Sequence, residues 1–131
     1  MIAYLDTSAA LKLLVEERES EHVAQYLSGR PDLDIVASML LYTELHCASR
    51  RRAAIPASSV NTVLKGINLV DATRLDFMVA AALPGQLTSA DALHLATAIR
   101  LETDMLVTYD VEMAAAAISA GLTVESPGSE L

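Results

Sequence analysis

The chain alternates short apolar runs with longer stretches of helical periodicity, and this alternation constrains its fold more than any other feature. Apolar runs typical of buried strands lie at 2–5, 34–37, 67–70, 105–108 and 122–124. Between these runs, apolar residues recur at helical spacing, with capping residues such as Ser38 and Thr88 at the boundaries. The pattern predicts an α/β fold with a mainly parallel central sheet of about five strands.

Nothing in the composition divides the chain, so we expect a single domain over residues 1–131 with a polar tail from about Glu125. A chain of 131 residues is long enough to bury one core. We expect Thr7 or Ser8 to cap a helix that continues through Val15. We also expect the acidic run from Glu16 to begin the next helix.

No segment of the sequence predicts a membrane or secretory role. The longest apolar run, 77–83, is far shorter than the ~20 residues that span a bilayer. Asp6 precedes any basic or long apolar region, so no signal peptide is visible. A single cysteine, Cys47, excludes an internal disulfide and argues against a structural zinc site. We therefore expect a soluble, cytoplasmic protein with no membrane partner.

The net charge of −8, from nine Lys and Arg against seventeen Asp and Glu, argues against general binding to nucleic acid. The charges are segregated, however, with an acidic run at 16–21 and a basic run at 50–52. Carboxylates gathered around a divalent cation would also be partly neutralised. The charge balance lowers the expectation of a nucleic-acid partner without excluding one.

Two expected strands end close to an aspartate. Asp6 follows the run Ile2–Leu5, and Asp110 follows the run at 105–108 by one residue. If both strands are parallel and near neighbours, the two carboxylates lie at the same edge of the sheet, where ligands gather in folds of this class. The alternative is that each aspartate caps the helix that follows it.

Two further acids lie on expected helices. Glu44 stands beside Leu41 and Leu45, at the edge of a face expected to be buried, where a carboxylate without a partner is costly. An ordinary solvated glutamate is the alternative. Asp91 follows Thr88 by three residues, as in a capping box, and its place in the first helical turn also favours its ionised form. Each acid is ambiguous when taken alone.

Taken together, the four acids predict a cation site. They cannot converge without a cation, because like charges repel strongly in a partly desolvated cleft. An all-oxygen set of ligands suits Mg²⁺ or Mn²⁺ rather than zinc. Such a site binds a phosphodiester oxygen, lowers the pKa of an attacking water and stabilises the charge that develops at phosphorus.

Four segments around these acids resemble, in order, the motif series of PIN-domain ribonucleases. They are Tyr4-Leu5-Asp6-Thr7-Ser8-Ala9, Tyr42-Thr43-Glu44-Leu45, Asp91-Ala92-Leu93-His94-Leu95-Ala96-Thr97-Ala98 and Leu106-Val107-Thr108-Tyr109-Asp110. The most similar group is the VapC toxins of bacterial toxin–antitoxin pairs. The resemblance runs from residue 4 to about residue 117, which is nearly the whole chain.

The resemblance implies a three-layer α/β/α domain, a homodimer, and Mg²⁺-dependent endonucleolytic cleavage of RNA in which Mn²⁺ can substitute. It also implies that a cognate, VapB-like antitoxin holds the toxin inactive. It places the catalytic, metal-binding acids at Asp6, Glu44, Asp91 and Asp110. Hydroxyl groups able to orient these acids fall at Thr7, Ser8 and Thr108, with helix capping or strand-end hydrogen bonding as their alternative role.

One departure from the family pattern concerns RNA contacts. Many relatives carry Arg near position 88, where this chain has Thr88, so no cation is expected to contact RNA there. The remaining weak candidates for RNA-phosphate contacts are Arg50, Arg51 and Arg52. Their alternative role is a favourable interaction with the carboxyl end of their own helix. His94, three residues after Asp91, is expected to be a packed core histidine rather than a base or ligand.

Three other functions remain open at this stage. A PIN-like scaffold could bind RNA or a partner without cutting. An aspartyl-phosphate phosphatase also carries an aspartate after its first strand, but it usually has a second one two residues later, where this chain has Ser8. A signalling receiver domain would need an acidic pair and a later lysine, for which Lys12 and Lys65 are poorly placed.

Overall fold

A computed structural model describes residues 1–129 and contains one sheet of five strands in the order β3-β2-β1-β4-β5. Every neighbouring pair in the sheet is parallel, which confirms the predicted sheet. Buried parallel strands read as continuous apolar runs because both of their faces are covered. The strands are β1 (Ile2–Leu5), β2 (Asp34–Ser38), β3 (Asn68–Val70), β4 (Met105–Val107) and β5 (Thr123–Glu125).

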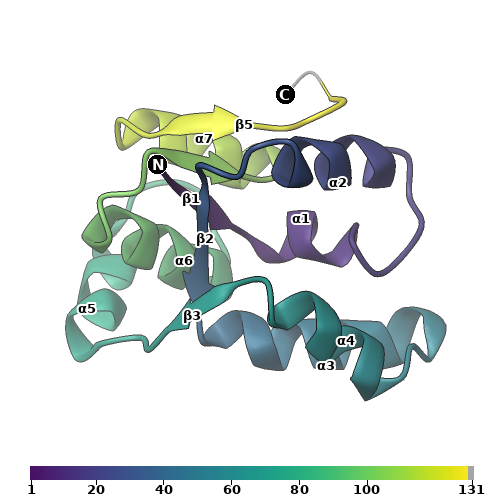
Figure 1. Cartoon of the computed structure of the whole chain (residues 1–131). Helices are drawn as coiled ribbons and strands as arrows, with labels where there is room; N and C mark the ends of the chain where they lie inside the picture. Colours follow the sequence, from purple (N-terminus) through teal and green to yellow (C-terminus); the bar gives the residue numbers. More distant parts are fainter. Residues whose placement is uncertain (130–131) are drawn as a thin grey trace.

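Helices cover both faces of the sheet and give the predicted three-layer α/β/α architecture (Figure 1). Figure 1 shows α3 and α4 side by side, and α5 and α6 packed against each other in the same way. No helix in the described part of the chain is both long and apolar enough to cross a membrane. The helices are α1 (Thr7–Leu11), α2 (Ser20–Ser28), α3 (Leu40–Ala53), α4 (Ala57–Leu64), α5 (Arg74–Ala82), α6 (Ser89–Arg100) and α7 (Val111–Ser119).

The expected bounds of the first two helices were wrong. Helix α1 ends at Leu11, and the chain continues in turns as far as Val15. The acidic run forms a turn instead of starting a helix, and the Lys12 ammonium lies 2.8 Å from a carboxylate oxygen of Glu19 in that turn. Helix α2 begins only at Ser20, whose hydroxyl accepts a hydrogen bond from the backbone N–H of Glu17 at 2.8 Å.

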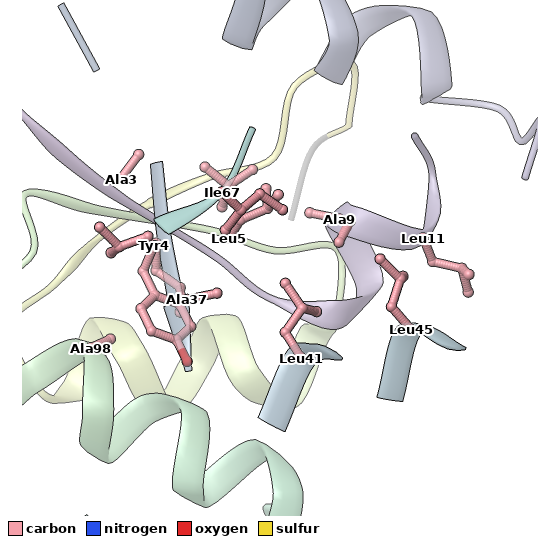
Figure 2. Packing of buried hydrophobic residues seen from close by; sticks show 14 of the residues in the cluster. Ala3, Tyr4, Leu5, Ala9, Leu11, Ala37, Leu41, Leu45, Ile67 and Ala98 are labelled. Atoms are coloured by element: carbon pink, nitrogen blue, oxygen red, sulfur yellow. The ribbon is translucent and has the colours of Figure 1, made fainter. Parts of the chain in front are cut away.

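The hydrophobic core lies along β1, the middle strand. Tyr4 and Leu5 are fully buried, and each fully buried apolar side chain of this size contributes about 2 kcal/mol to stability. Successive strand residues point to opposite faces, so the two side chains pack into different layers. Figure 2 shows Tyr4 leaving β1 towards the side of the sheet that carries Ala98 of α6. This direction brings its hydroxyl group to the edge of the site described next.

The strand order fixes where a ligand can bind. From β1 the chain crosses to β2 and then β3 on one side, whereas β4 and β5 lie on the other side. Helices that cross in opposite directions leave a crevice beyond the carboxyl ends of the two central strands. In this chain the corresponding place is the ends of β1 and β4, where Asp6 and the segment 108–110 lie.

Candidate functional site at the carboxyl ends of the central strands

Asp6 lies directly after β1 and is almost completely buried, with 2% of its surface exposed. Its Oδ1 accepts hydrogen bonds from the Ser8 hydroxyl at 2.7 Å and from the Ala9 backbone N–H at 3.0 Å, which caps α1. Its Oδ2 accepts a hydrogen bond from the Thr108 hydroxyl at 2.5 Å. Burial raises the pKa of Asp6, and these hydrogen bonds oppose the rise without cancelling it.

Asp110 lies at the same edge of the sheet as Asp6, because β1 and β4 pair in parallel with Leu5 opposite Val107. Its carboxylate caps α7 by accepting a hydrogen bond from the Met113 N–H at 2.8 Å. Its own backbone N–H donates to the Thr108 hydroxyl oxygen at 3.1 Å. Thr108 therefore joins the two strand-end acids through a single buried hydroxyl group.

Glu44 extends from α3 towards the same edge, and its side chain is 24% exposed. The Thr7 hydroxyl donates to Glu44 Oε1 at 2.9 Å, and His94 Nε2 forms a short hydrogen bond to the same oxygen. Burial alone would raise the pKa of Glu44, but the hydrogen bonds from His94 and Thr7 lower it overall. Glu44 is therefore a partly buried carboxylate that is hydrogen-bonded to Thr7 and His94, not a solvated surface glutamate.

Asp91 lies in the first turn of α6, where the Thr88 hydroxyl accepts a hydrogen bond from the Asp91 backbone N–H at 3.2 Å. The reciprocal bond of a full capping box forms between Thr73 and Asp76 at the start of α5, but not between Thr88 and Asp91. Burial raises the pKa of Asp91, and the negative charge of Asp110 raises it further. The Asp91 carboxylate therefore shares the electrostatic environment of the strand-end acids.

The three predicted hydroxyl residues all lie against these acids. Thr7 bonds to Glu44, whereas Ser8 and Thr108 bond to Asp6. The Ser8 oxygen also accepts a hydrogen bond from the Tyr109 backbone N–H at 2.9 Å, so it ties the start of α1 to the end of β4. These contacts fix the side chains and the local backbone at the same time.

The basic run lies away from these contacts, at the carboxyl end of α3. Arg50 and Arg51 are exposed, and Arg52 lies 3.2 Å from a carboxylate oxygen of Glu17. Three cations in the last turn interact favourably with the helix dipole. Thr88 is an exposed N-cap residue, so position 88 offers no charged side chain.

His94 has a larger part in the site than the sequence suggested. It is completely buried, as expected, but both of its ring nitrogens have polar partners. Nδ1 lies 2.6 Å from the Tyr4 hydroxyl oxygen, and Nε2 bonds to Glu44. A histidine inside an apolar helical stretch must satisfy both nitrogens, and this requirement is the signal that indicates polar partners. The identity of those partners depends on the tertiary fold.

The donors at this edge are carboxylate and hydroxyl oxygens, which match the preferences of Mg²⁺ and Mn²⁺. Within residues 1–129, no three Asp, Glu, His or Cys side chains stand as closely as they would around a bound cation. Hydrogen bonds from Thr108 and Thr7 hold the carboxylates of Asp6 and Glu44 in place. By its donor chemistry, the group fits a hard divalent cation.

Comparison with known proteins identifies the family. A family model described as the PIN domain matches residues 3–119. Ribonuclease VapC46 of Mycobacterium tuberculosis is 38% identical over 128 residues, which cover 95% of this chain and 96% of the relative.

Solved structures share the fold at lower sequence identity. VapBC2 from Rickettsia felis, bound to a DNA fragment from its promoter, matches with a TM-score of 0.78 at 16% identity, over 95% of this chain and 98% of that chain. A toxin–antitoxin complex from Klebsiella pneumoniae matches with a TM-score of 0.72 at 21% identity, over 98% and 99% of the two chains. With the family model and the sequence relative, these findings show that the chain belongs to the PIN-domain family and, within it, to the VapC-type proteins.

Proposed function

We propose that this protein is a cytoplasmic, Mg²⁺-dependent endoribonuclease that acts as the toxin of a toxin–antitoxin pair, with Mn²⁺ able to substitute. One observation carries the proposal above all others. Hydroxyl groups of neighbouring residues hold the carboxylates of Asp6 and Glu44, and burial with the negative charges of Asp110 and Glu44 raises the pKa of Asp91, which supports a shared site near the carboxyl ends of β1 and β4. The proposed metal ligands are Asp6, Glu44, Asp91 and Asp110.

The electrostatics of the acids support a cation at this place. Burial raises the pKa values of Asp6 and Asp91, so each pays a desolvation penalty when it is ionised. A nearby positive charge offsets that penalty, so cation binding and ionisation of Asp6 and Asp91 favour each other. When bound, a divalent cation supplies an activated water and neutralises charge on the scissile phosphate.

The side chains around the acids have separate tasks in this proposal. Thr108 and Ser8 fix the two oxygens of Asp6, so its carboxylate keeps one orientation during turnover. Thr7 and His94 do the same for Glu44. No protein nucleophile is required, because water attacks the phosphodiester directly and RNA leaves with two new ends.

The proposed partners are RNA, a cognate antitoxin and a second copy of the chain. The relative from M. tuberculosis is named a ribonuclease, and the K. pneumoniae structure is a toxin–antitoxin complex. Exposed apolar side chains on α5 support a homodimer, since Leu75, Phe77 and Met78 are each more than half exposed.

The direct test of the function is a map of new RNA ends across the transcriptome after brief induction in a bacterial host. Wild type is compared with Asp6→Asn and with Asp34→Asn. Asp34 is an exposed residue at the amino end of β2, which makes it a matched control at the opposite edge of the sheet. We expect a few sharp new ends with wild type and with Asp34→Asn, and none with Asp6→Asn.

Two results would contradict the proposal. Identical ends from wild type and Asp6→Asn would show that the acid at this position is not needed for cleavage. An absence of new ends from a folded wild-type protein would favour a PIN-like scaffold that binds without cutting. Circular dichroism of each purified variant confirms that the comparison is made between folded proteins.

A further inference from the structure

His94 and Tyr4 form a buried hydrogen-bonded chain that ends on Glu44. Tyr4 and His94 are both fully buried, and their rings pack edge to face with centroids 5.8 Å apart. The Tyr4 hydroxyl also accepts a hydrogen bond from the Ser38 backbone N–H at 2.9 Å. The series of hydrogen bonds therefore links the end of β2 to β1, then to α6 and finally to α3. Figure 2 shows Tyr4 directed to the α6 side of the sheet.

Counting donors and acceptors gives the direction of each bond. The Ser38 N–H can only donate, so the Tyr4 oxygen accepts there and its own proton is free to point to His94. An ionised Glu44 can only accept, so His94 Nε2 carries the proton that they share. In a neutral imidazole Nδ1 is then an acceptor, which matches the Tyr4 donor. The Nε2–H tautomer therefore pairs every donor with an acceptor.

The hydrogen bonds from His94 and Thr7 reach only one of the two carboxylate oxygens of Glu44. His94 and Thr7 both bond to Oε1, and within residues 1–129 no hydrogen bond involves Oε2. The Glu44 side chain is 24% exposed, whereas His94 is completely enclosed. Oε1 is therefore held by the protein, whereas Oε2 has no hydrogen-bond partner among residues 1–129 and is open to water or a ligand.

We propose that Tyr4 and His94 are positioning residues: they hold Glu44 by Oε1, with His94 as the Nε2–H tautomer, and so present Oε2 to a divalent cation. This inference rests on the proposed function, because it takes Glu44 to be a metal ligand. His94 acts through Glu44 and does not bind the cation itself, because its Nε2 carries a proton and its Nδ1 is bonded to Tyr4. Partners of this kind commonly change metal affinity by about 10-fold to 100-fold.

The first test reads the tautomer without metal or activity. The ¹⁵N chemical shifts of the three histidine side chains are measured in metal-free protein, with His94→Gln used to assign the His94 signals. In wild type we expect a protonated Nε2 and an unprotonated, hydrogen-bonded Nδ1 at His94. In Tyr4→Phe, which removes the hydroxyl and keeps the ring, we expect the Nδ1 shift to move to the value of a free acceptor.

The second test measures Mn²⁺ affinity by calorimetry with matched variants. Tyr4→Phe is expected to bind Mn²⁺ more weakly than wild type, and His94→Leu, which removes the direct partner of Glu44, at least about 10-fold more weakly. Tyr26→Phe is the control, because the Tyr26 hydroxyl bonds to the Met105 sulfur at 3.1 Å and has no contact with the acids. His94→Leu removes the donor to Glu44, and His94→Gln keeps a side-chain N–H, so the glutamine variant should recover part of the lost affinity.

The outcomes separate this inference from the function on which it rests. If wild type binds Mn²⁺ and Tyr4→Phe binds it equally well, the positioning role is overturned while the metal site stands. An Nδ1–H tautomer or an imidazolium at His94 in wild type would overturn it as well. If wild type binds no Mn²⁺ at all, the proposed metal site fails, and the positioning role fails with it whichever tautomer is found.

Discussion

Replacing Thr108 by valine removes one buried hydroxyl group and leaves the shape of the side chain nearly unchanged. Thr108 is fully buried, donates to Asp6 Oδ2 at 2.5 Å and accepts the Asp110 N–H at 3.1 Å. A hydrogen bond to a charged group contributes about 2 kcal/mol, and leaving the Asp110 N–H without its acceptor costs about 1 kcal/mol more. We expect Thr108→Val to destabilise the protein by about 3 kcal/mol, or about 9 °C in Tm for a chain of this size.

The assay is urea unfolding followed by circular dichroism, with EDTA present so that no cation contributes. Thr103→Val is the matched control, because Thr103 is also buried but donates only to a neutral carbonyl, that of Ala98 at 3.2 Å. That control should cost about 1 kcal/mol. A Thr108→Val cost no larger than the Thr103→Val cost would refute the view that a charge-assisted bond ties the two strand-end acids together.

The cost of Thr108→Val should also depend on pH with a definite sign. Burial raises the folded-state pKa of Asp6, and the Thr108 bond opposes that rise, so removing the bond raises the pKa further. In the folded variant Asp6 then binds a proton more readily than in the folded wild-type protein, so the stability of the variant falls more steeply as pH increases. The difference should be larger above the folded pKa of Asp6 than below it. A pH-independent difference would contradict this assignment.

Three further predictions follow from other parts of the molecule. Asp76→Asn should cost about 3 kcal/mol in urea unfolding, because Asp76 is buried and its Oδ1 lies 2.8 Å from Arg100 Nε. Burial raises the pKa of Asp76, but the hydrogen bond and charge of Arg100 lower it overall. The stability that the ionised Asp76 contributes is therefore present above the unfolded-state pKa of about 3.9, and it is lost as pH falls through the folded-state pKa. Burial and the charge of Asp110 raise the pKa of Asp91. The metal-free protein should therefore lose stability as pH rises from the unfolded-state pKa of Asp91 through its folded-state pKa. Asp91→Asn should remove that loss in pH-dependent thermal scans. Phe77→Glu should convert the proposed homodimer to a monomer in light scattering without loss of Tm, because Phe77 is 58% exposed in the single chain.

The positions of Asp6 and Asp110 could be predicted from sequence because each follows an apolar run that both faces of a sheet must bury. Once two strands are neighbours and parallel, their carboxyl ends lie at the same edge of the sheet, which is where residues 6 and 110 follow β1 and β4. Local patterns failed at the run 16–19, which carries helix-forming residues yet forms a turn. In that turn Lys12 pairs with Glu17 and Glu19, and Ser20 caps the backbone, contacts that helical spacing does not reveal.

The contact between His94 and Glu44 shows a different limit of sequence reasoning. Periodicity correctly buries His94, but the residue that satisfies its ring lies 50 positions away on another helix. Helical spacing pointed instead to Asp91, three residues earlier. Only the packing of α6 against β1 and β2 selects Tyr4 and Glu44 as the partners. Such partners can be predicted only from the tertiary fold, because residues close to His94 in the sequence do not indicate that Tyr4 and Glu44 contact it.

The measurement that tests the central claim most directly is Mn²⁺ binding followed by electron paramagnetic resonance. Wild type is compared with Asp34→Asn and with the four amide variants Asp6→Asn, Glu44→Gln, Asp91→Asn and Asp110→Asn. We predict that wild type and Asp34→Asn bind equally well, and that each of the four amide variants binds more than about 10-fold more weakly. Unchanged affinity in all four variants, or no binding by folded wild type, would contradict the assignment of one cation site to these acids.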